Sequence, residues 1–160
     1  MVIIENKEQL DSFLKIYSKE DSIITPISSD EHKHPVEIDI CLLYVQMMNG
    51  EEFILPFSHS EALNIEVPNL QSDTKKYTYD KKKLNHLVSV NNVTDVNLLH
   101  YMKTNEPLNI ENIDTSAHYF FNMKHYRKKN VNRVIPILKH LEYCRELTKK
   151  LKIEIESTRD

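Results

Sequence analysis

Two clusters of basic residues with aromatic rings among them are the parts of this sequence best suited to binding chemistry. The first cluster comprises Lys75, Lys76, Lys81, Lys82 and Lys83, with Tyr77 and Tyr79 between them. The second comprises Lys124, His125, Arg127, Lys128, Lys129 and Arg133, with Tyr119, Phe120, Phe121 and Tyr126 nearby. Cations that follow phosphates, with rings that stack on bases, hold single-stranded nucleic acid without sequence preference. The alternative is a solvated lysine face beside core aromatics, which the acidic balance of the chain favours.

Other kinds of site find little support in the sequence. A single glycine, Gly50, excludes glycine-rich phosphate loops, because those loops need several residues without a Cβ atom. His32 and His34 have a spacing seen in metal sites, but no further histidine or cysteine stands near them. Cys41 and Cys144 are interpreted as buried, reduced thiols. We therefore predict no catalytic residue and no metal ligand.

Length and charge place the chain among ordinary globular proteins. It has 160 residues, 40% of them hydrophobic, and a formal net charge of −3. This predicts one domain spanning residues 1–160. No stretch is apolar enough for a membrane span, and the N-terminus resembles no signal peptide, so we expect a cytoplasmic protein. The abundance of lysine, asparagine and isoleucine hints at an AT-rich genome, such as that of a virus or phage, and then at the host cytoplasm.

The first half of the chain predicts a helix followed by antiparallel strands. Residues 2–4 suit a short strand, and residues 5–20 have helical spacing with Asn6 as the N-cap. Residues 22–28 read as a strand, in which Pro26 predicts an edge position, a bulge or an early end. Residues 36–48 and 51–58 read as two strands of a hairpin. The Asn-Gly pair between them favours a type I′ turn.

The second half predicts a strand–helix–strand unit and C-terminal helices. The strands are expected at residues 75–80 and 93–96, with a helix at 80–90 between them and a further helical segment after the second strand. Another helix is expected after Asp114 or Thr115. The longest helix covers residues 130–156, with Pro136 in its first turn or at a kink. Its apolar stripe is expected to follow Val134, Leu138, Leu141, Cys144 or Arg145, Thr148 and Leu151.

This order of elements resembles the ribonuclease H-like 3′–5′ exonuclease domain of family A DNA polymerases. Four stretches carry the resemblance: residues 5–30 (ENKEQLDSFLKIYSKEDSIITPISSD), 51–63 (EEFILPFSHSEAL), 75–87 (KKYTYDKKKLNHL) and 93–102 (VTDVNLLHYM). The implied fold class is α/β, with an α+β-like mixed sheet. Three antiparallel strands begin it, and a β-α-β unit and C-terminal helices follow.

The resemblance also implies a degenerate catalytic site. Such exonucleases hold two divalent metal ions with an Asp and a Glu on the first strand, a middle Asp, and an Asp on the last helix. Thr25 and Ile27 stand at the first pair here, while Asp80 retains the middle carboxylate and Asp95 matches a recurrent Asp. The last-helix motif, Tyr-x-x-x-Asp, would fall within residues 126–135, which contain no carboxylate. We therefore expect no cofactor, with Mg²⁺ or Mn²⁺ bound only by a rearranged site. Asp80 and Asp95 also suit helix N-caps.

Three functions follow from these observations. The first is a catalytically inactive accessory protein of nucleic-acid metabolism, which binds a polymerase or a replication or transcription complex and also single strands. The second is a structural or interaction subunit of a viral or polymerase complex that does not touch nucleic acid. The third is an active nuclease with a rearranged site using Asp80, Asp95, Asp114 and Glu37 or Asp39. Whether the two basic clusters share one face separates the first two.

Overall fold

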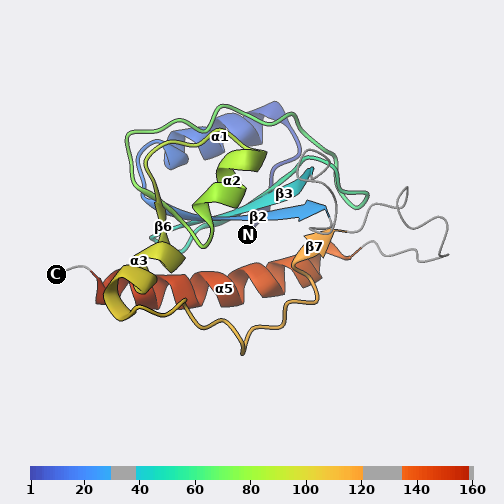
Figure 1. The fold of residues 1–160 in the computed structure, drawn as a ribbon. Helices are drawn as coiled ribbons and strands as arrows, with labels where there is room; N and C mark the ends of the chain where they lie inside the picture. Colours follow the sequence, from blue (N-terminus) through green and yellow to red (C-terminus); the bar gives the residue numbers. More distant parts are fainter. Residues whose placement is uncertain (30–38, 121–134, 159–160) are drawn as a thin grey trace.

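The protein, seen in a computed structural model, has a mixed sheet between two layers of helices (Figure 1). The structure describes residues 1–29, 39–120 and 135–158. Its elements, in chain order, are β1 (Val2–Ile3), α1 (Lys7–Tyr17), β2 (Ser22–Ser29), β3 (Ile40–Met47), β4 (Glu52–Pro56), β5 (Lys76–Thr78), α2 (Lys81–Leu87), β6 (Val93–Asp95), α3 (Val96–Thr104), β7 (Tyr119–Phe120) and α5 (Ile137–Ser157). Helices α1 and α2 lie on one side of the sheet, and α5 crosses the other side with α3 beside it.

The strand order of the sheet is β1-β4-β3-β2-β5-β6, and β7 also pairs with β2. Strands β2, β3 and β4 are antiparallel neighbours, whereas β5 runs parallel to both β2 and β6. The expected antiparallel start and the β-α-β unit are therefore confirmed. Strand β1 adds a parallel partner at the outer side of β4.

Strand β2 is central in the sheet although Pro26 lies in its middle, so the predicted edge position is wrong. The amide of Ser22 donates to the carbonyl of Lys75, 3.2 Å away on the β5 side. Because backbone direction alternates along a strand, the nitrogen of Pro26 faces that same side. No described strand pairs there, since β5 pairs with β2 at Ser22 and Ile23, and β7 pairs with β2 at Ser28 and Ser29. The missing N–H of the proline thus leaves no ladder hydrogen bond unmade. Of the predicted alternatives, an irregularity is present: the register with β3 shifts between Ile27 and Ser28, just after the proline.

The β3–β4 hairpin forms where it was predicted, with a different turn. Gly50 has a φ of 99°, but Asn49 does not have the positive φ that a type I′ turn requires. The Gly50 amide donates to the carbonyl of Met47, and the Met47 amide donates to the carbonyl of Glu51. This pattern is typical of a three-residue loop that ends in a left-handed glycine. The side chain of Asn49 accepts the Glu51 amide at 3.0 Å and supports the turn.

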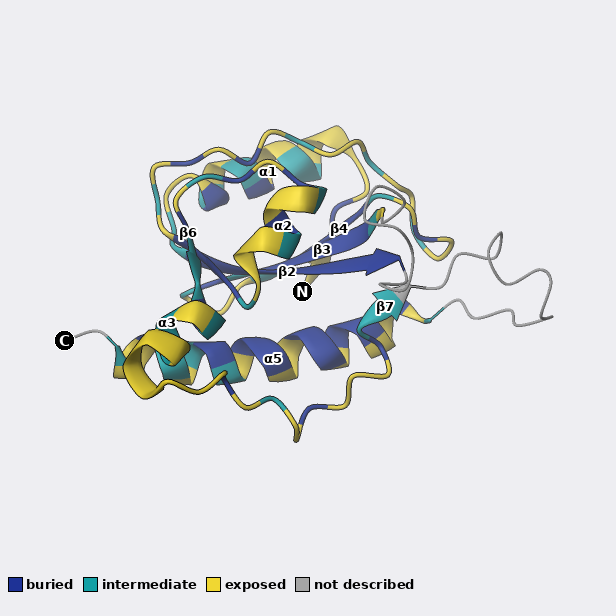
Figure 2. Cartoon of the chain, viewed as in Figure 1, coloured by how far each residue is buried: buried dark blue, intermediate teal, exposed yellow. Residues whose placement is uncertain are grey.

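Each face of the sheet has its own hydrophobic core. Phe13 and Tyr17 of α1 and Leu84 of α2 pack on the face that carries Ile24. The opposite face carries Ile23 and Ile27 and packs on α5. Figure 2 shows this arrangement as a buried side of α5 turned to the sheet and an exposed side turned away. Since side chains alternate along a strand, Thr25 faces α5 together with its neighbours Ile23 and Ile27.

The C-terminal helix begins later than predicted. Helix α5 starts at Ile137, directly after Pro136. Proline has no N–H group to donate to a carbonyl of a preceding turn, so the helix does not extend to residues before it. Leu138, which was predicted to face the core, is 69% exposed, because the buried face of the helix follows Ile137, Leu141, Cys144 and Leu151 instead. The helix expected after Asp114 does not form in the described residues, where a turn and strand β7 follow instead; residues 121–134 lie outside the described part of the chain. In the described part of the chain, no helix combines the length and apolar character needed to cross a membrane.

Candidate functional site

A small pocket opens on the α5 side of the sheet, beside the unpaired middle of β2. Its lining comes from β2, the end of β5, the start of α2, the segment before β7, and α5. The lining residues are Thr25, Pro26, Thr78, Tyr79, Asp80, Lys83, His118, Tyr143 and Leu147. The cavity volume is about 30 Å³, roughly the space of a single water molecule. A nucleotide does not fit in this pocket without movement of its walls.

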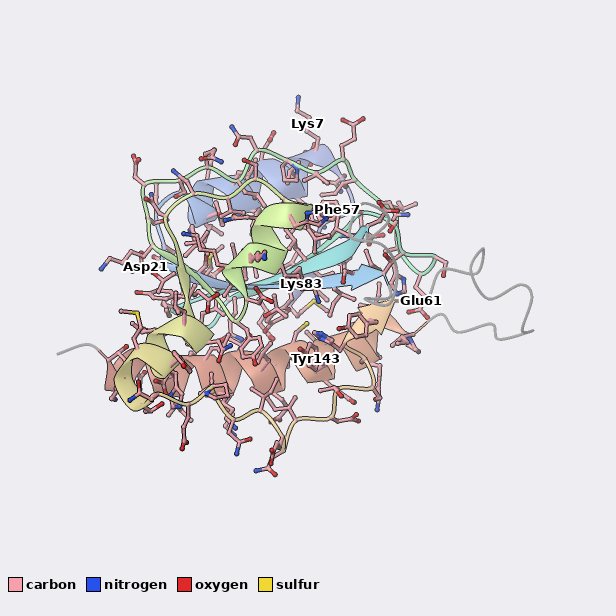
Figure 3. All side chains as sticks on the ribbon, in the orientation of Figure 1. Lys7, Asp21, Phe57, Glu61, Lys83 and Tyr143 are labelled. Carbon is pink, nitrogen blue, oxygen red and sulfur yellow. The ribbon has the colours of Figure 1, made fainter. Side chains whose placement is uncertain are left out.

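The sequence-predicted residues Thr25, Asp80 and Lys83 meet in this pocket. Figure 3 shows Lys83 at α2 and Tyr143 on α5, on either side of the space between the two helices. The hydroxyl of Thr25 is buried and forms no hydrogen bond with any described residue. The Nζ atom of Lys83 is also buried and lies 5.0 Å from the centroid of the Tyr119 ring.

Asp80 and Asp95 both cap helices, as the sequence predicted. One carboxylate oxygen of Asp80 accepts the Lys83 amide at 3.1 Å at the start of α2. Asp95 accepts the Leu98 amide at 2.8 Å at the start of α3. Its second oxygen accepts the Lys81 amide at 3.0 Å. The two carboxylates therefore hold the starts of α2 and α3, where anionic groups also suit the helix dipoles.

The donors of this pocket do not fit a pair of hard divalent metal ions. Mg²⁺ and Mn²⁺ require several carboxylate or other oxygen ligands converging on one point. Among the described lining residues Asp80 alone carries a carboxylate, and that group caps α2. Lys83 adds an ammonium group to the same pocket, and a positive charge there repels cations. Asp114 lies elsewhere, in a surface hollow with Lys139 and Glu142, and Glu37 lies outside the described residues.

Two further lining residues, Tyr143 and Leu147, were not singled out from the sequence. They are four residues apart on α5, so they lie one above the other on the same face of the helix. Both are buried and face the pocket. The signal that could have found them is a Tyr-x-x-x-Leu spacing inside the longest helix. The stretch 126–135, where the motif was expected, lies outside the described residues except for Ile135.

The first basic cluster is divided between the surface and the interior. Lys75, Lys81 and Lys82 are exposed. Tyr79 is half-buried, and its burial, followed by the charges of the nearby Asp80 and Asp95, raises its pKa. The second cluster, comprising Lys124, Arg127, Lys128, Lys129 and Arg133, lies outside the described residues.

Lys76 and Tyr77 are buried, so neither belongs to an exposed basic surface. The ammonium group of Lys76 donates to the carbonyls of Tyr17 at 2.7 Å and Glu20 at 2.9 Å, at the C-terminal end of α1. It also lies 3.6 Å from the centroid of the Tyr17 ring. Burial lowers the pKa of Lys76 to about 8, partly opposed by the charges of Asp21 and Glu20. Strand β5 directs the side chain of Lys76 beneath α1, where its ammonium group stabilises the C-terminal end of that helix.

Comparison with known proteins supports the fold and not a closer relationship. No protein-family model matches the sequence, and no curated protein matches it. Among solved structures, the EXO domain of Nibbler from Aedes aegypti is similar over 99% of this chain and 89% of its own length, with a TM-score of 0.55 and 11% identity. The chain therefore has the ribonuclease H-like exonuclease fold.

A second structure agrees with this assignment. The catalytic core of RRP6 from Trypanosoma brucei is similar over 98% of this chain, with a TM-score of 0.53 and 11% identity. This chain spans 48% of the RRP6 core. The expected exonuclease fold is thus confirmed, whereas the link to family A polymerases stays a prediction. Fold alone does not fix function, so function must be argued from the pocket and the surface.

Proposed function

We propose that this protein is a catalytically inactive, exonuclease-like accessory factor of nucleic-acid metabolism. The observation that carries the proposal is the composition of the pocket beside β2. Thr25 and Ile27 stand where the fold's first-strand carboxylates are expected, and Leu147 follows Tyr143 at the spacing of the last-helix aspartate. Asp80 is then the one carboxylate retained among the four positions. A single carboxylate that caps a helix, beside a lysine, does not hold two divalent ions.

The exposed lysines support contact with a nucleic-acid backbone. Lys75, Lys81 and Lys82 lie just before β5 and in the first turn of α2, on the exposed surface. Exposed lysines that neutralise phosphates release counterions, which makes binding weaken with salt. Because the pocket is too small for a nucleotide, we infer that a strand lies across the surface and not inside the pocket.

One surface of α3 supports a protein partner. Leu98, Tyr101 and Met102 are 55%, 50% and 74% exposed, and their spacing puts them on one face of the helix. An apolar helix face left open to solvent is typical of an interaction site. This face favours binding to a polymerase or to another subunit of a replication or transcription complex. It also keeps open the second function, an interaction subunit without nucleic-acid contact.

The deciding experiment measures binding and degradation together. Labelled single-stranded DNA and RNA are incubated with the protein and Mg²⁺ or Mn²⁺ at about 50 and about 200 mM salt. We expect salt-sensitive binding without degradation. Degradation that requires the metal and survives repurification would contradict the inactive state. The absence of both binding and degradation would favour the interaction subunit.

A charge-matched pair of variants locates the binding surface. The test variant combines Lys75→Gln, Lys81→Gln and Lys82→Gln. The control combines Lys7→Gln, Lys15→Gln and Lys19→Gln on and just after α1, where all three lysines are exposed. We expect the test variant alone to reduce the slope of log affinity against log salt, by about two. Equal effects of both variants would indicate attraction by net charge without a defined surface.

A further inference from the structure

Three buried side chains from distant parts of the chain meet behind the start of α5. Cys41 lies on β3, His59 follows β4, and His140 lies in the first turn of α5. Their exposed fractions are 1%, 1% and 0%. One potential ligand atom from each side chain lies within 4.8 Å of the other two. No residue of this cluster lines the pocket of Asp80, so it is independent of the proposed loss of nuclease activity.

His140 presents an unused nitrogen lone pair inside the cluster. Its Nδ1 atom lies 2.8 Å from the carbonyl oxygen of Ala117, so Nδ1 carries the proton and donates it. The Nε2 atom then has a lone pair, and it is buried without a hydrogen-bond partner among the described residues. A buried acceptor without a partner is unfavourable unless something binds it. A carbonyl that fixes the tautomer of a histidine from behind is the usual support of a metal-binding imidazole.

His59 is held beside it in a fixed orientation. Its Nε2 atom lies 2.9 Å from the Ile135 carbonyl, and its Nδ1 atom accepts the Glu61 amide at 3.1 Å. The His59 and His140 rings stand edge to face, with centroids 5.5 Å apart. A side-chain oxygen of Glu61 also accepts the Ile137 amide at 2.8 Å, which ties this loop to the start of α5; Figure 3 shows Glu61 beside that end of the helix. A bound cation takes the place of one of these ring hydrogen bonds of His59.

The thiol of Cys41 supplies the third potential ligand atom of the cluster. Without a cation the thiol keeps its proton and points at the carbonyl of Ser58, 3.8 Å away. Metal binding would convert it to the thiolate and release that proton to solvent.

We propose that Cys41, His59 and His140 form a Zn²⁺ site that links β3, the loop after β4, and α5. One thiolate and two imidazoles are ligands for Zn²⁺ and not for Mg²⁺, which prefers oxygen. A tetrahedral Zn²⁺ ion holds its ligand atoms roughly 3.5 Å apart, so the cluster closes by roughly 1 Å on binding. Water or another small ligand takes the fourth position. The site ties the last helix to the sheet across a long stretch of sequence.

The first test measures metal binding to the full chain. The protein is stripped with a chelator, dialysed against Zn²⁺ at micromolar concentration, and analysed for bound metal. Co²⁺ replaces Zn²⁺ in a parallel titration, because a thiolate ligand gives cobalt an intense near-ultraviolet charge-transfer band. We expect about one ion per chain, the thiolate band, and a rise in melting temperature that saturates with Zn²⁺. Absence of retained metal, or a cobalt spectrum without the thiolate band, would overturn the proposal.

Matched variants assign the ligands. Cys41→Ala and His140→Gln each remove one ligand, and Cys144→Ala removes the other buried cysteine, which lies outside the cluster. We expect affinity for Zn²⁺ to fall by at least about tenfold in the first two variants and to stay unchanged in the third. Two ligand variants are used so that a folding defect in one still leaves a test. Unchanged affinity in a folded ligand variant, or equal loss in Cys144→Ala, would show that the ion binds elsewhere.

Discussion

Arg145 on α5 binds Glu52 on β4 through two parallel hydrogen bonds, Nε to Oε2 at 2.6 Å and Nη2 to Oε1 at 2.8 Å. The same carboxylate accepts the hydroxyl of Tyr44 at 2.5 Å. Glu52 is 16% exposed and Arg145 48% exposed. The pair therefore joins the C-terminal helix to the sheet at a half-buried position. A bidentate arginine–carboxylate pair of this kind is stronger than a simple surface ion pair.

The first prediction concerns the pH dependence of this pair. Hydrogen bonds from Arg145, and to a lesser extent from Tyr44, lower the pKa of Glu52. A carboxyl group with a lowered pKa stabilises the fold at pH values above its ordinary pKa near 4.5. This stabilisation is lost as the pH falls through the lowered pKa. Glu52→Gln should reduce the free energy of unfolding by about 1 kcal/mol at pH 7 and by less in acid. Urea denaturation at both pH values measures this. The control is Glu66→Gln at an exposed loop position, and an equal, pH-independent effect of both variants would contradict the prediction.

The second prediction concerns the buried ammonium group of Lys76. Its pKa of about 8 lies below the ordinary value of 10.5. At pH values between these two pKa values, the unfolded chain therefore binds more protons than the folded one. Stability from this group therefore rises with pH in that window. Lys76→Met should lower the free energy of unfolding by about 2 kcal/mol near pH 7.5, because it leaves the carbonyls of Tyr17 and Glu20 without this donor. The loss relative to wild type should be larger near pH 9.5.

Urea midpoints at the two pH values test the Lys76 prediction. Lys75→Met is the matched control, since the neighbouring side chain is exposed. A difference between wild type and Lys76→Met that shrinks as the pH rises would contradict the inferred burial of the charge.

The third prediction separates a helix cap from a metal ligand at Asp80. Asparagine caps a helix about as well as aspartate, whereas alanine does not. Asp80→Asn should leave stability nearly unchanged, and Asp80→Ala should reduce it by about 1 kcal/mol. Neither should change the binding or integrity of a single-stranded substrate. If a catalytic metal depended on this carboxylate, both substitutions would abolish degradation equally, which the nuclease assay would reveal.

The fourth prediction uses the unpaired hydroxyl of Thr25. Valine has nearly the same shape without the polar group, so Thr25→Val removes a buried oxygen that has no partner among the described residues. We expect the free energy of unfolding to stay equal or to rise by up to about 1 kcal/mol. Thr74→Val is the contrasting control, because the Thr74 hydroxyl donates to the Tyr17 carbonyl at 3.1 Å. The free energies of unfolding are measured by calorimetry. A larger loss of stability in Thr25→Val than in Thr74→Val would contradict the prediction and show that the Thr25 hydroxyl stabilises the fold.

The fold was largely predictable because local signals and strand order agreed. The Asn6, Asp80 and Asp95 caps, the Asn49–Gly50 hairpin and the apolar strands all form where the sequence placed them. Pro26 misled the prediction of strand position, since proline excludes pairing on one side only and the sequence does not reveal which neighbours are absent. The gap between β5 and β7 is a tertiary feature that no local pattern encodes.

The candidate site was less predictable than the fold. A lysine in a short strand reads as a surface cation, yet the strand direction buries Lys76 beneath α1. Tyr143 and Leu147 looked like core residues of a long helix, and only the packing of α5 against β2 brings them to Asp80. Cys41, His59 and His140 are far apart in sequence. Their meeting depends on the register of β3, the loop after β4 and the start of α5 together.

Helix α5 supplies nine buried side chains, yet it is the last element that the structure describes. During synthesis on the ribosome, the sheet face that carries Ile23, Ile27 and Tyr44 therefore stays exposed to solvent until α5 has been made. The central strand must wait for partners from three later parts of the chain, and such long-range contacts form slowly. Until α5 has been made, the nascent protein therefore exposes apolar surface of the kind that makes partly folded chains prone to aggregate.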